Sequence, residues 1–377
     1  MRPDKWRERL ESEASKGLRR TLPEAGPHDG ETIDCGSNDY LGLSRHPRVI
    51  EAARDALERY GAGATASRLL RGNREIHVHL EEELAALKGT PSALVYSSGY
   101  AANLGLLSAI CDRADTIFCD SMDHASLVDG ARLARASLRF YNHADSEHLD
   151  RQLSRRSGGH AWIVTDGVFS MDGVLAPLPD LLAVADRHDA TLIVDDAHAT
   201  GVVGPNGAGT LAYFGIDPGR VIHMGTLSKA LGAQGGYVCG PRELTELLVQ
   251  SSRAFIYSTG LNPAAAAAAL EGLRVSIEEP QWREKLHAHL HALRKGLIEG
   301  GCRIYGEDPA PMCAVHVGDA EEAMQVAARL AEHDVLAPAI RPPTVPAGTS
   351  RIRLAPTASL DEAEVRTVIK EVLAALG

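Results

Sequence analysis

Short apolar runs that alternate with helix-like segments are the feature of this sequence that most limits its fold. Five such runs lie at residues 93–96, 116–119, 161–165, 191–194 and 221–224. Consecutive apolar residues indicate strands buried on both faces, and strands separated by helices are typical of parallel sheets. We therefore predict an α/β fold whose large domain has a mostly parallel sheet with helices on both faces.

The helix-like segments include one clear amphipathic helix and one long connecting helix. Residues 74–88 place apolar side chains on one face and glutamates on the other. The alanine-rich stretch at 263–273 begins a helix that we expect to leave the main domain. Beyond about residue 280 the pattern predicts a smaller α/β unit, with strands near 313–317, 335–340 and 351–354.

Two helices of this C-terminal part begin with capping patterns. Asp319 is followed three residues later by Glu322, and Ser359 by Glu362, which predicts helices that start at Asp319 and Ser359. The expected organisation is an N-terminal segment at 1–39, a large domain at 40–275 and a smaller C-terminal α/β domain at 276–377.

Charge and cysteine usage exclude several classes of partner. A net charge of −11 over 377 residues argues against nucleic acid or an anionic membrane as the main partner. The six cysteines are far apart and form no CxxC pair, which favours reduced thiols in a cytoplasmic protein over a disulfide framework or a zinc site. The first twenty residues lack the apolar core of a secretory signal, and no run approaches the roughly 20 apolar residues of a membrane span.

Polar residues with distinctive chemistry follow two of the predicted strands. The run at 191–194 ends at Asp195, with His198 three residues later, and the run at 221–224 leads into a turn that contains Thr226 and Lys229. A lysine can form a Schiff base with an aldehyde, and a carboxylate can hold a pyridinium nitrogen protonated so that the ring accepts carbanion electrons. This combination predicts a site for pyridoxal 5′-phosphate (PLP).

Further candidates follow the other strands. Residues 97–103 resemble the opening of a helix, whose backbone N–H groups favour a phosphate. His124 and Ser170 come after the runs at 116–119 and 161–165. Ligands of open α/β sheets bind at the carboxyl ends of the strands. We therefore expect positions 99, 124, 170, 195 and 229 to gather at one edge of the sheet.

Other motifs have simpler explanations. The GxGxxA pattern at 61–66 follows a helix-like segment rather than a strand, which disfavours a dinucleotide site. The sequence has no Gly-Lys dipeptide and therefore no Walker A loop. The histidines at 77, 79, 287, 289 and 291 lie in charged helical segments, where a solvated face is the expected interpretation. We expect no metal site.

Several motifs together resemble the α-oxoamine synthases, PLP enzymes of fold type I. The resemblance runs from about Arg19 to the C-terminus, and its motifs lie at residues 37–43, 123–126, 166–173, 194–201, 226–229 and 256–259. Within that family, the segment at 340–354 resembles the 8-amino-7-oxononanoate synthases. Two features depart from the family: Asp166 stands where the family often has Glu, and the segment between Arg19 and Ser37 is shorter than usual.

The resemblance implies a role for each residue that follows a predicted strand. Lys229 would hold PLP and take the α-proton of the amino acid, and Asp195 would pair with the ring nitrogen. His198 would pair with the phenolic oxygen, and His124 would stack on the ring. These roles agree with those expected from the residue types alone.

The resemblance also implies residues for the phosphate and the substrates. The phosphate would be held by Ser98, Gly99, Tyr100 and Thr226, with Thr259 reaching the phosphate of a neighbouring subunit in a homodimer that shares its active sites. The residues expected at the substrates are Arg19 near the acyl chain, Arg351 at the carboxylate, and Asn38 and Ser170 at the reaction centre.

The implied reaction joins L-alanine to pimeloyl-CoA, or to a pimeloyl carrier protein, with loss of CO₂ and the thiol, in biotin synthesis. Glycine with a different acyl-CoA is a competing interpretation, because a small side-chain pocket separates glycine from alanine by only about 1–3 kcal/mol. Outside the family, a fold type I aminotransferase or a PLP-binding protein without catalysis would use the same Asp and Lys.

Overall fold

The computed structural model describes residues 3–15, 19, 22 and 32–377. Its centre is a seven-stranded sheet with the strand order β2-β8-β7-β6-β5-β3-β4. All of its pairings are parallel except the two that β8 makes, with β7 and with β2. The strands are β2 (Ser92–Tyr96), β3 (Thr116–Asp120), β4 (Ser137–Tyr141), β5 (Ala161–Asp166), β6 (Ala190–Asp195), β7 (Val221–Thr226) and β8 (Gly236–Gly240).

The five apolar runs are all strands, which confirms the predicted mostly parallel sheet. The structure adds two strands that the sequence pattern did not indicate. Strand β4 is at the edge of the sheet and only Tyr141 is fully buried in it, so it lacks a continuous apolar run. Strand β8 begins and ends with glycine, and its short apolar centre at 237–239 gave too weak a signal.

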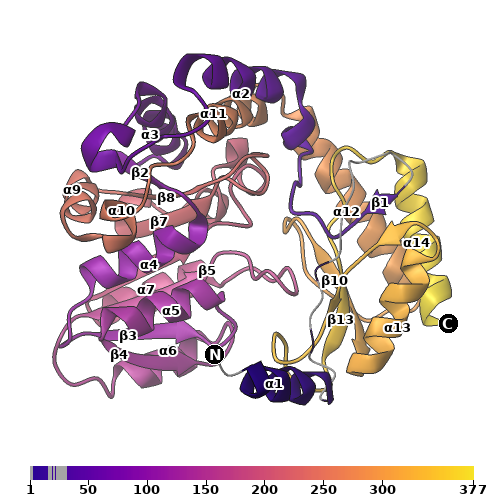
Figure 1. Cartoon of the computed structure of the whole chain (residues 1–377). Helices are drawn as coiled ribbons and strands as arrows, with labels where there is room; N and C mark the ends of the chain where they lie inside the picture. Colours follow the sequence, from indigo (N-terminus) through magenta and orange to yellow (C-terminus); the bar gives the residue numbers. More distant parts are fainter. Residues whose placement is uncertain (1–2, 16–18, 20–21, 23–31) are drawn as a thin grey trace.

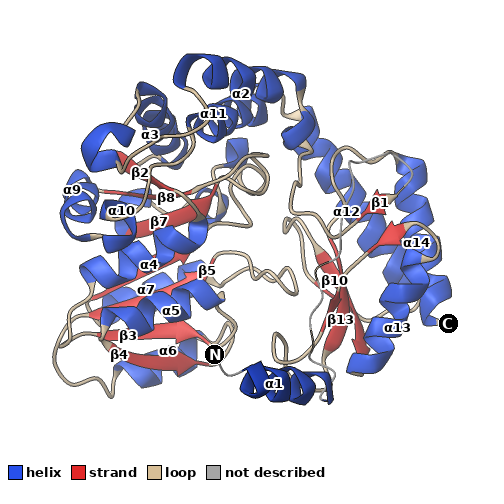
Figure 2. Ribbon diagram, viewed as in Figure 1, coloured by secondary structure: helices blue, strands red, loops and turns tan. Residues whose placement is uncertain are grey.

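Helices cover both faces of this sheet (Figure 2). Ile193 on β6 points into one apolar cluster, while its neighbours Leu192 and Val194 point into another, as expected for a strand buried on both faces. The first face is covered by α4 (Gly99–Ile110), α5 (Ala125–Ala134), α9 (Arg242–Ser251) and α10 (Arg253–Ile256). The second is covered by α3 (Glu75–Lys88), α6 (Ser146–Leu153), α7 (Leu178–Arg187), α8 (Thr210–Phe214) and α11 (Pro263–Glu278).

A second sheet lies in the C-terminal part of the chain (Figure 1). It is antiparallel, with the order β12-β13-β10-β9. Its strands are β9 (Ile304–Tyr305), β10 (Cys313–Gly318), β12 (Ala339–Ile340) and β13 (Ser350–Leu354). The helices of this part are α12 (Gln281–Glu299), α13 (Ala320–Ala331) and α14 (Glu362–Leu376).

The structure refines three expectations for these regions. The predicted strand at 335–340 is two short strands, β11 (Val335–Leu336) and β12, and β11 pairs with β1 (Ile33–Asp34) instead of joining the larger sheet. The expected domain boundary at 275/276 falls inside α11, which packs against α2 (Pro47–Tyr60) and leads into α12. In the N-terminal segment, α1 (Pro3–Ser15) has no buried residue.

Two helix-level predictions were wrong. Helix α14 is capped by Asp361 with Glu364 in a capping box, so Ser359 does not cap this helix. Three of the histidines assigned to solvated faces are hydrogen-bonded to backbone carbonyls: His77 to Leu261, His287 to Val202 and His289 to Thr357. Within the described residues, no helix is long and apolar enough to cross a membrane.

A buried ion pair joins α3 to the residue after β6. Lys88 Nζ lies 2.9 Å from Asp196 Oδ2, and both side chains are almost completely buried. Burial lowers the pKa of Lys88, but the carboxylate of Asp196 outweighs this effect and the pKa is raised. Thr210 donates both its N–H and its hydroxyl to Asp196. The pair therefore fixes the start of the loop that carries His198.

We predict that Lys88→Met strongly destabilises the protein. The substitution leaves the Asp196 carboxylate buried without its counter-ion, which costs about 3–5 kcal/mol in comparable sites. The free energy of unfolding, measured by urea denaturation, should fall by this amount. The matched control is Lys370→Met, because Lys370 pairs with Glu371 at the surface and its loss should cost less than about 0.5 kcal/mol. Equal stabilities of the two variants would contradict the prediction.

Candidate active site

The parallel register of the central strands gathers acidic side chains at one edge of the sheet. Asp166 is the last residue of β5 and Asp195 the last residue of β6, and the two are direct partners in the register. Asp195 is also level with Met224 of β7, two residues before Thr226. The loop that follows β5 extends from this edge toward β10 and β13 (Figure 1).

Asp195 is held by two N–H donors. Its Oδ2 accepts from Nδ2 of Asn103 at 2.8 Å, and its Oδ1 accepts from the backbone N–H of Ala197 at 2.9 Å. The side chain is 4% exposed. A carboxylate fixed by two donors in a buried place is suited to hold a protonated ring nitrogen in one position.

Lys229 lies in the turn after β7, where burial lowers the pKa of its amine to about 8. The charges of Asp195 and Asp166 act in the opposite direction, while the Arg353 guanidinium lowers the pKa further. The amine is therefore a much better nucleophile and proton acceptor near neutral pH than a solvated lysine.

His124 is the N-cap of α5 and lies beside the same edge. Its Nδ1 accepts from the backbone N–H of Ser126, and its own backbone N–H donates to Asp166 at 2.8 Å. Burial lowers the pKa of the imidazole, although the charge of Asp195 opposes this effect. The ring also lies edge-on to Tyr100, with centroids 6.5 Å apart.

Asp166 acts as a structural acceptor at this edge. Burial and the charge of Asp195 raise the pKa of Asp166 well above its usual range, which favours the protonated form of this carboxyl. Asp123, which accepts the backbone N–H of Asp166, has a pKa raised by burial and by the charge of Asp166. The Asp166 carboxyl therefore serves as the hydrogen-bond acceptor for the backbone N–H of His124.

A second cluster joins the two sheets. His198 Nδ1 lies 2.6 Å from the hydroxyl of Tyr40. Arg353 on β13 donates to Asn38 Oδ1 at 2.9 Å, to the Tyr40 hydroxyl at 3.2 Å and to the backbone carbonyl of Ser170 at 2.8 Å. Burial and the nearby cations of Lys229 and Arg353 lower the pKa of His198 well below its usual value. His198 is therefore neutral.

The structure separates the two arginines of β13. Arg351 donates to Thr349 and lies 3.7 Å from Asp172 Oδ2, with its guanidinium over the ring of Tyr305. Arg353, two residues later, is the one that contacts Asn38 and whose charge affects Lys229. Arg351 was the expected carboxylate ligand, but Arg353 is the arginine that joins the predicted site.

Two expected residues lie apart from this cluster. Thr259 is exposed and forms a β-bridge with Ser67. Arg19 is exposed, and most of its chain neighbours lie outside the described residues. In the part of the chain that the structure describes, the site around Lys229 therefore forms without either residue.

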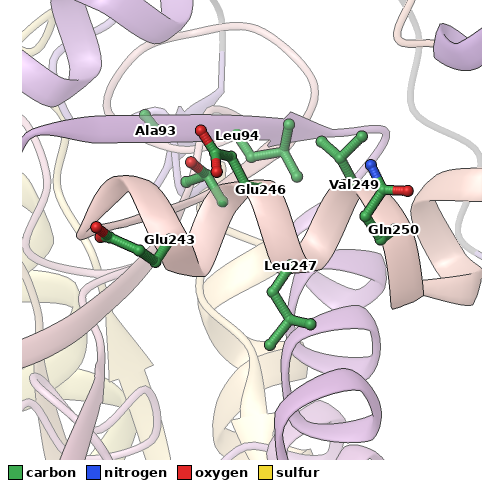
Figure 3. A pocket seen from close by; sticks show the side chains of 8 residues that line it. Ala93, Leu94, Glu243, Glu246, Leu247, Val249 and Gln250 are labelled. Carbon is green, nitrogen blue, oxygen red and sulfur yellow. The ribbon is translucent and has the colours of Figure 1, made fainter.

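A surface pocket of about 530 Å³ lies elsewhere, between β2 and α9 (Figure 3). Carboxylates of Glu243 and Glu246 and apolar side chains such as Leu247 line it. None of the candidate-site residues contributes to it, so it does not belong to the candidate site.

Known proteins resemble this chain over almost its whole length. A model of the aminotransferase class I and II family matches residues 31–372. The 8-amino-7-oxononanoate synthase of Anaeromyxobacter dehalogenans is 47% identical over 364 residues, which is 94% of this chain and 91% of that protein. The serine palmitoyltransferase of S. paucimobilis, solved with a bound PLP–myriocin aldimine, is similar with a TM-score of 0.91 and 31% identity over 99% of this chain and 96% of that one.

The chain belongs to the α-oxoamine synthases, a family of PLP-dependent acyltransferases. The fold type I architecture is thereby confirmed. A further solved relative, the 8-amino-7-oxononanoate synthase of Francisella tularensis, has a TM-score of 0.80 and 28% identity, over 92% of this chain and 98% of that one.

The residues of this α-oxoamine synthase fit the phosphate end of PLP. Ser98 caps α4, whose N-terminus lies beside the end of β7 and favours an anion there. A Cβ at Gly99 would lie 3.4 Å from that of Thr226, and one at Gly236 would lie 2.5 Å from the backbone of Gly99. Glycine at position 236 is what allows the backbone to pack this closely beside Thr226.

The sequence motifs missed three residues of the α-oxoamine synthase site. Asn103, Tyr40 and Arg353 all lie within the motifs or segments named above, yet none received a role. A polar residue in an otherwise apolar helix, as Asn103 is in α4, was the available signal, because buried amides need hydrogen-bond partners.

We predict that the rate at which cofactor-free protein binds PLP depends on the Lys229 amine. Only the neutral amine attacks the aldehyde, so the rate should rise roughly tenfold per pH unit below the pKa and level off above a pH of about 8. Stopped-flow absorbance over this pH range measures it. A rate that keeps rising to about pH 10, as expected for a solvated lysine, would contradict the assignment. Lys229→Ala controls for non-covalent binding.

Proposed function

We propose that the protein condenses L-alanine with a pimeloyl thioester, releasing CO₂ and the thiol, to form 8-amino-7-oxononanoate for biotin synthesis. The name of the Anaeromyxobacter relative, at 47% identity, supports this substrate pair. The observation that carries the proposal is the position of Arg353. This side chain extends from the small sheet to Asn38, and its positive charge lowers the pKa of Lys229. A cation there is suited to the carboxylate of an amino acid.

The cofactor supplies an electron sink for the electron pair that remains when the amino acid loses its α-proton. In this proposal the chain supplies the acid–base groups. Lys229 takes the α-proton at Nζ, which is possible near neutral pH because burial lowers the pKa of Lys229 to about 8. Asp195 is proposed to pair with the ring nitrogen, and its carboxyl oxygens are held by Asn103 and the backbone of Ala197.

The two histidines contribute as neutral rings. The Tyr40 hydroxyl lies 2.6 Å from His198 Nδ1 and 3.2 Å from Asn38 Oδ1, and we propose that the shorter contact takes its single proton. His198 then carries its own proton on Nε2, where it can donate to the phenolic oxygen of PLP. His124 is proposed to stack on the ring, and Ser98, Gly99, Tyr100 and Thr226 to hold the phosphate.

We also propose a homodimer in the cytoplasm. Thr259 is exposed and is proposed to reach the phosphate of the second subunit, as in the family that the chain resembles. Arg19 and Ser170 are proposed to lie near the acyl substrate and the reaction centre. All six cysteines are free, which supports a reducing compartment.

The test of the substrate pair measures release of thiol by purified protein with PLP and pimeloyl-CoA. We expect release with L-alanine at least about tenfold faster than with glycine, since one methyl group in a fitted pocket contributes about 1–3 kcal/mol. Release only with glycine or serine and a different acyl-CoA would keep the family and overturn the substrates. No thiol release with the CoA or carrier-protein form, together with transamination of a keto acid, would indicate an aminotransferase instead.

We predict that Arg353→Met raises the KM for alanine by about 10- to 100-fold, because a hydrogen bond to a charged group contributes about 1.5–3 kcal/mol. The matched control is Arg351→Met on the same face of β13. It removes contacts with Thr349 and Asp172 and should change the KM for alanine much less. A larger effect for Arg351→Met would return the carboxylate role to Arg351. Steady-state kinetics at saturating pimeloyl-CoA gives both values.

A further inference from the structure

A buried chain of hydrogen bonds connects Asp195 to His124 through Asn103 and Ser126. Asn103 on α4 donates its Nδ2 to Asp195 Oδ2 at 2.8 Å and to Ser126 Oγ at 2.9 Å. Ser126 Oγ lies 2.7 Å from His124 Nδ1. Asn103 and Ser126 are each 1% exposed, so water does not compete for these bonds.

The fold brings α4 and α5 unusually close at this point. A Cβ on Gly130 of α5 would lie 2.9 Å from the backbone oxygen of Asn103, so only glycine permits the approach. This contact places Ser126, in the first turn of α5, within reach of the Asn103 amide. The connection is therefore a consequence of how the two helices pack.

The orientation of the Asn103 amide follows from its neighbours. Both of its N–H groups have acceptors, whereas its Oδ1 is buried without a hydrogen-bond partner among the described residues. A flipped amide would direct this oxygen at the carboxylate of Asp195, which is repulsive. In this orientation the Asn103 Oδ1 stays unpaired, while both N–H groups of Nδ2 keep their hydrogen bonds to Asp195 and Ser126.

The backbone N–H of Ser126, which donates to His124 Nδ1, decides how the protons of this chain of hydrogen bonds are placed. Ser126 accepts from Asn103 and has one hydroxyl proton, which goes to His124 Nδ1. The backbone N–H of Ser126 also points to this nitrogen at 3.3 Å. Because Nδ1 accepts two bonds, the proton of the neutral ring lies on Nε2.

We propose that Asn103 and Ser126 are positioning residues that fix the Asp195 carboxylate and hold His124 as the neutral tautomer protonated on Nε2. This inference rests on the proposed roles of Asp195 and His124 at the cofactor. Other groups that face His124 are the charge of Lys229, the carboxyl group of Asp166, which accepts its backbone N–H, and the ring of Tyr100. The lowered pKa of His124, caused mainly by burial, is consistent with the neutral ring.

The first test measures the titration of His124 in full-length, cofactor-free protein. Diethylpyrocarbonate reacts with neutral imidazole, and the tryptic peptide 114–132 contains no other histidine, so mass spectrometry gives its rate against pH. Ser126→Ala should raise the midpoint by about one pH unit, since it removes a donor that stabilises the neutral ring. Ser126→Thr, which keeps the hydroxyl, should restore the wild-type midpoint.

The matched control is Ser108→Ala on α4, whose hydroxyl donates to the carbonyl of Leu104, away from this chain of bonds. Its profile should superimpose on that of the wild type. A Ser126→Ala profile that also superimposes would overturn the proposal. Should Ser126→Ala fail to fold, ¹⁵N NMR of histidine-labelled wild-type protein decides instead, with the His124 signals assigned by His124→Asn. A proton on Nδ1 would overturn the proposal, and one on Nε2 would support it.

The second test measures PLP affinity by equilibrium dialysis. Asn103→Leu removes the donor to Asp195 with little change in volume and should raise the Kd for PLP about 10- to 100-fold. An unchanged Kd would overturn the role of Asn103. Wild-type protein that does not bind PLP at all would instead overturn the proposed function, so the two failures are distinguishable.

Discussion

The parallel register of β5, β6 and β7 is the constraint on which the site depends. Because Asp166 and Asp195 are direct partners in adjacent strands, both carboxyl groups are forced to the same buried edge. Two ionised carboxylates so close together repel each other strongly in a medium of low polarity. Burial and the charge of Asp195 raise the pKa of Asp166, whose Oδ2 accepts the backbone N–H of His124.

The C-terminal sheet contributes Arg353 to the site, although it does not pair with the strands of the central sheet. Strand β13 brings Arg353 to Asn38, Tyr40 and Ser170, which lie in two segments far apart in sequence. One guanidinium therefore connects the N-terminal segment, the loop after β5 and the C-terminal sheet. Any relative movement of the two sheets would change the position of this cation relative to Lys229, so the proposed binding of the amino acid would depend on how the sheets are arranged.

Strand positions and the main catalytic candidates could be predicted because they depend on local pattern: an apolar run, then a polar residue at its end. Which of Arg351 and Arg353 reaches Asn38 could not be predicted. Both are on one face of β13, and it is the hydrogen bond to Asn38, in the distant N-terminal segment, that distinguishes them. Asn103 was missed for a similar reason, since its partners come from α5 and β6. The capping error at Ser359 was local, because Asp361 offered a competing cap two residues later.

The two histidines of the site reach the same protonation state by different routes. In the proposed arrangement, His198 Nδ1 receives the hydroxyl of Tyr40, and His124 Nδ1 receives the hydroxyl and the N–H of Ser126. In both cases the neighbouring donor leaves the ring proton on Nε2, and both rings have a lowered pKa, chiefly through burial. The histidines then act as donors rather than bases. Lys229, with a pKa lowered to about 8, remains as the group at this edge suited to accept a proton near neutral pH.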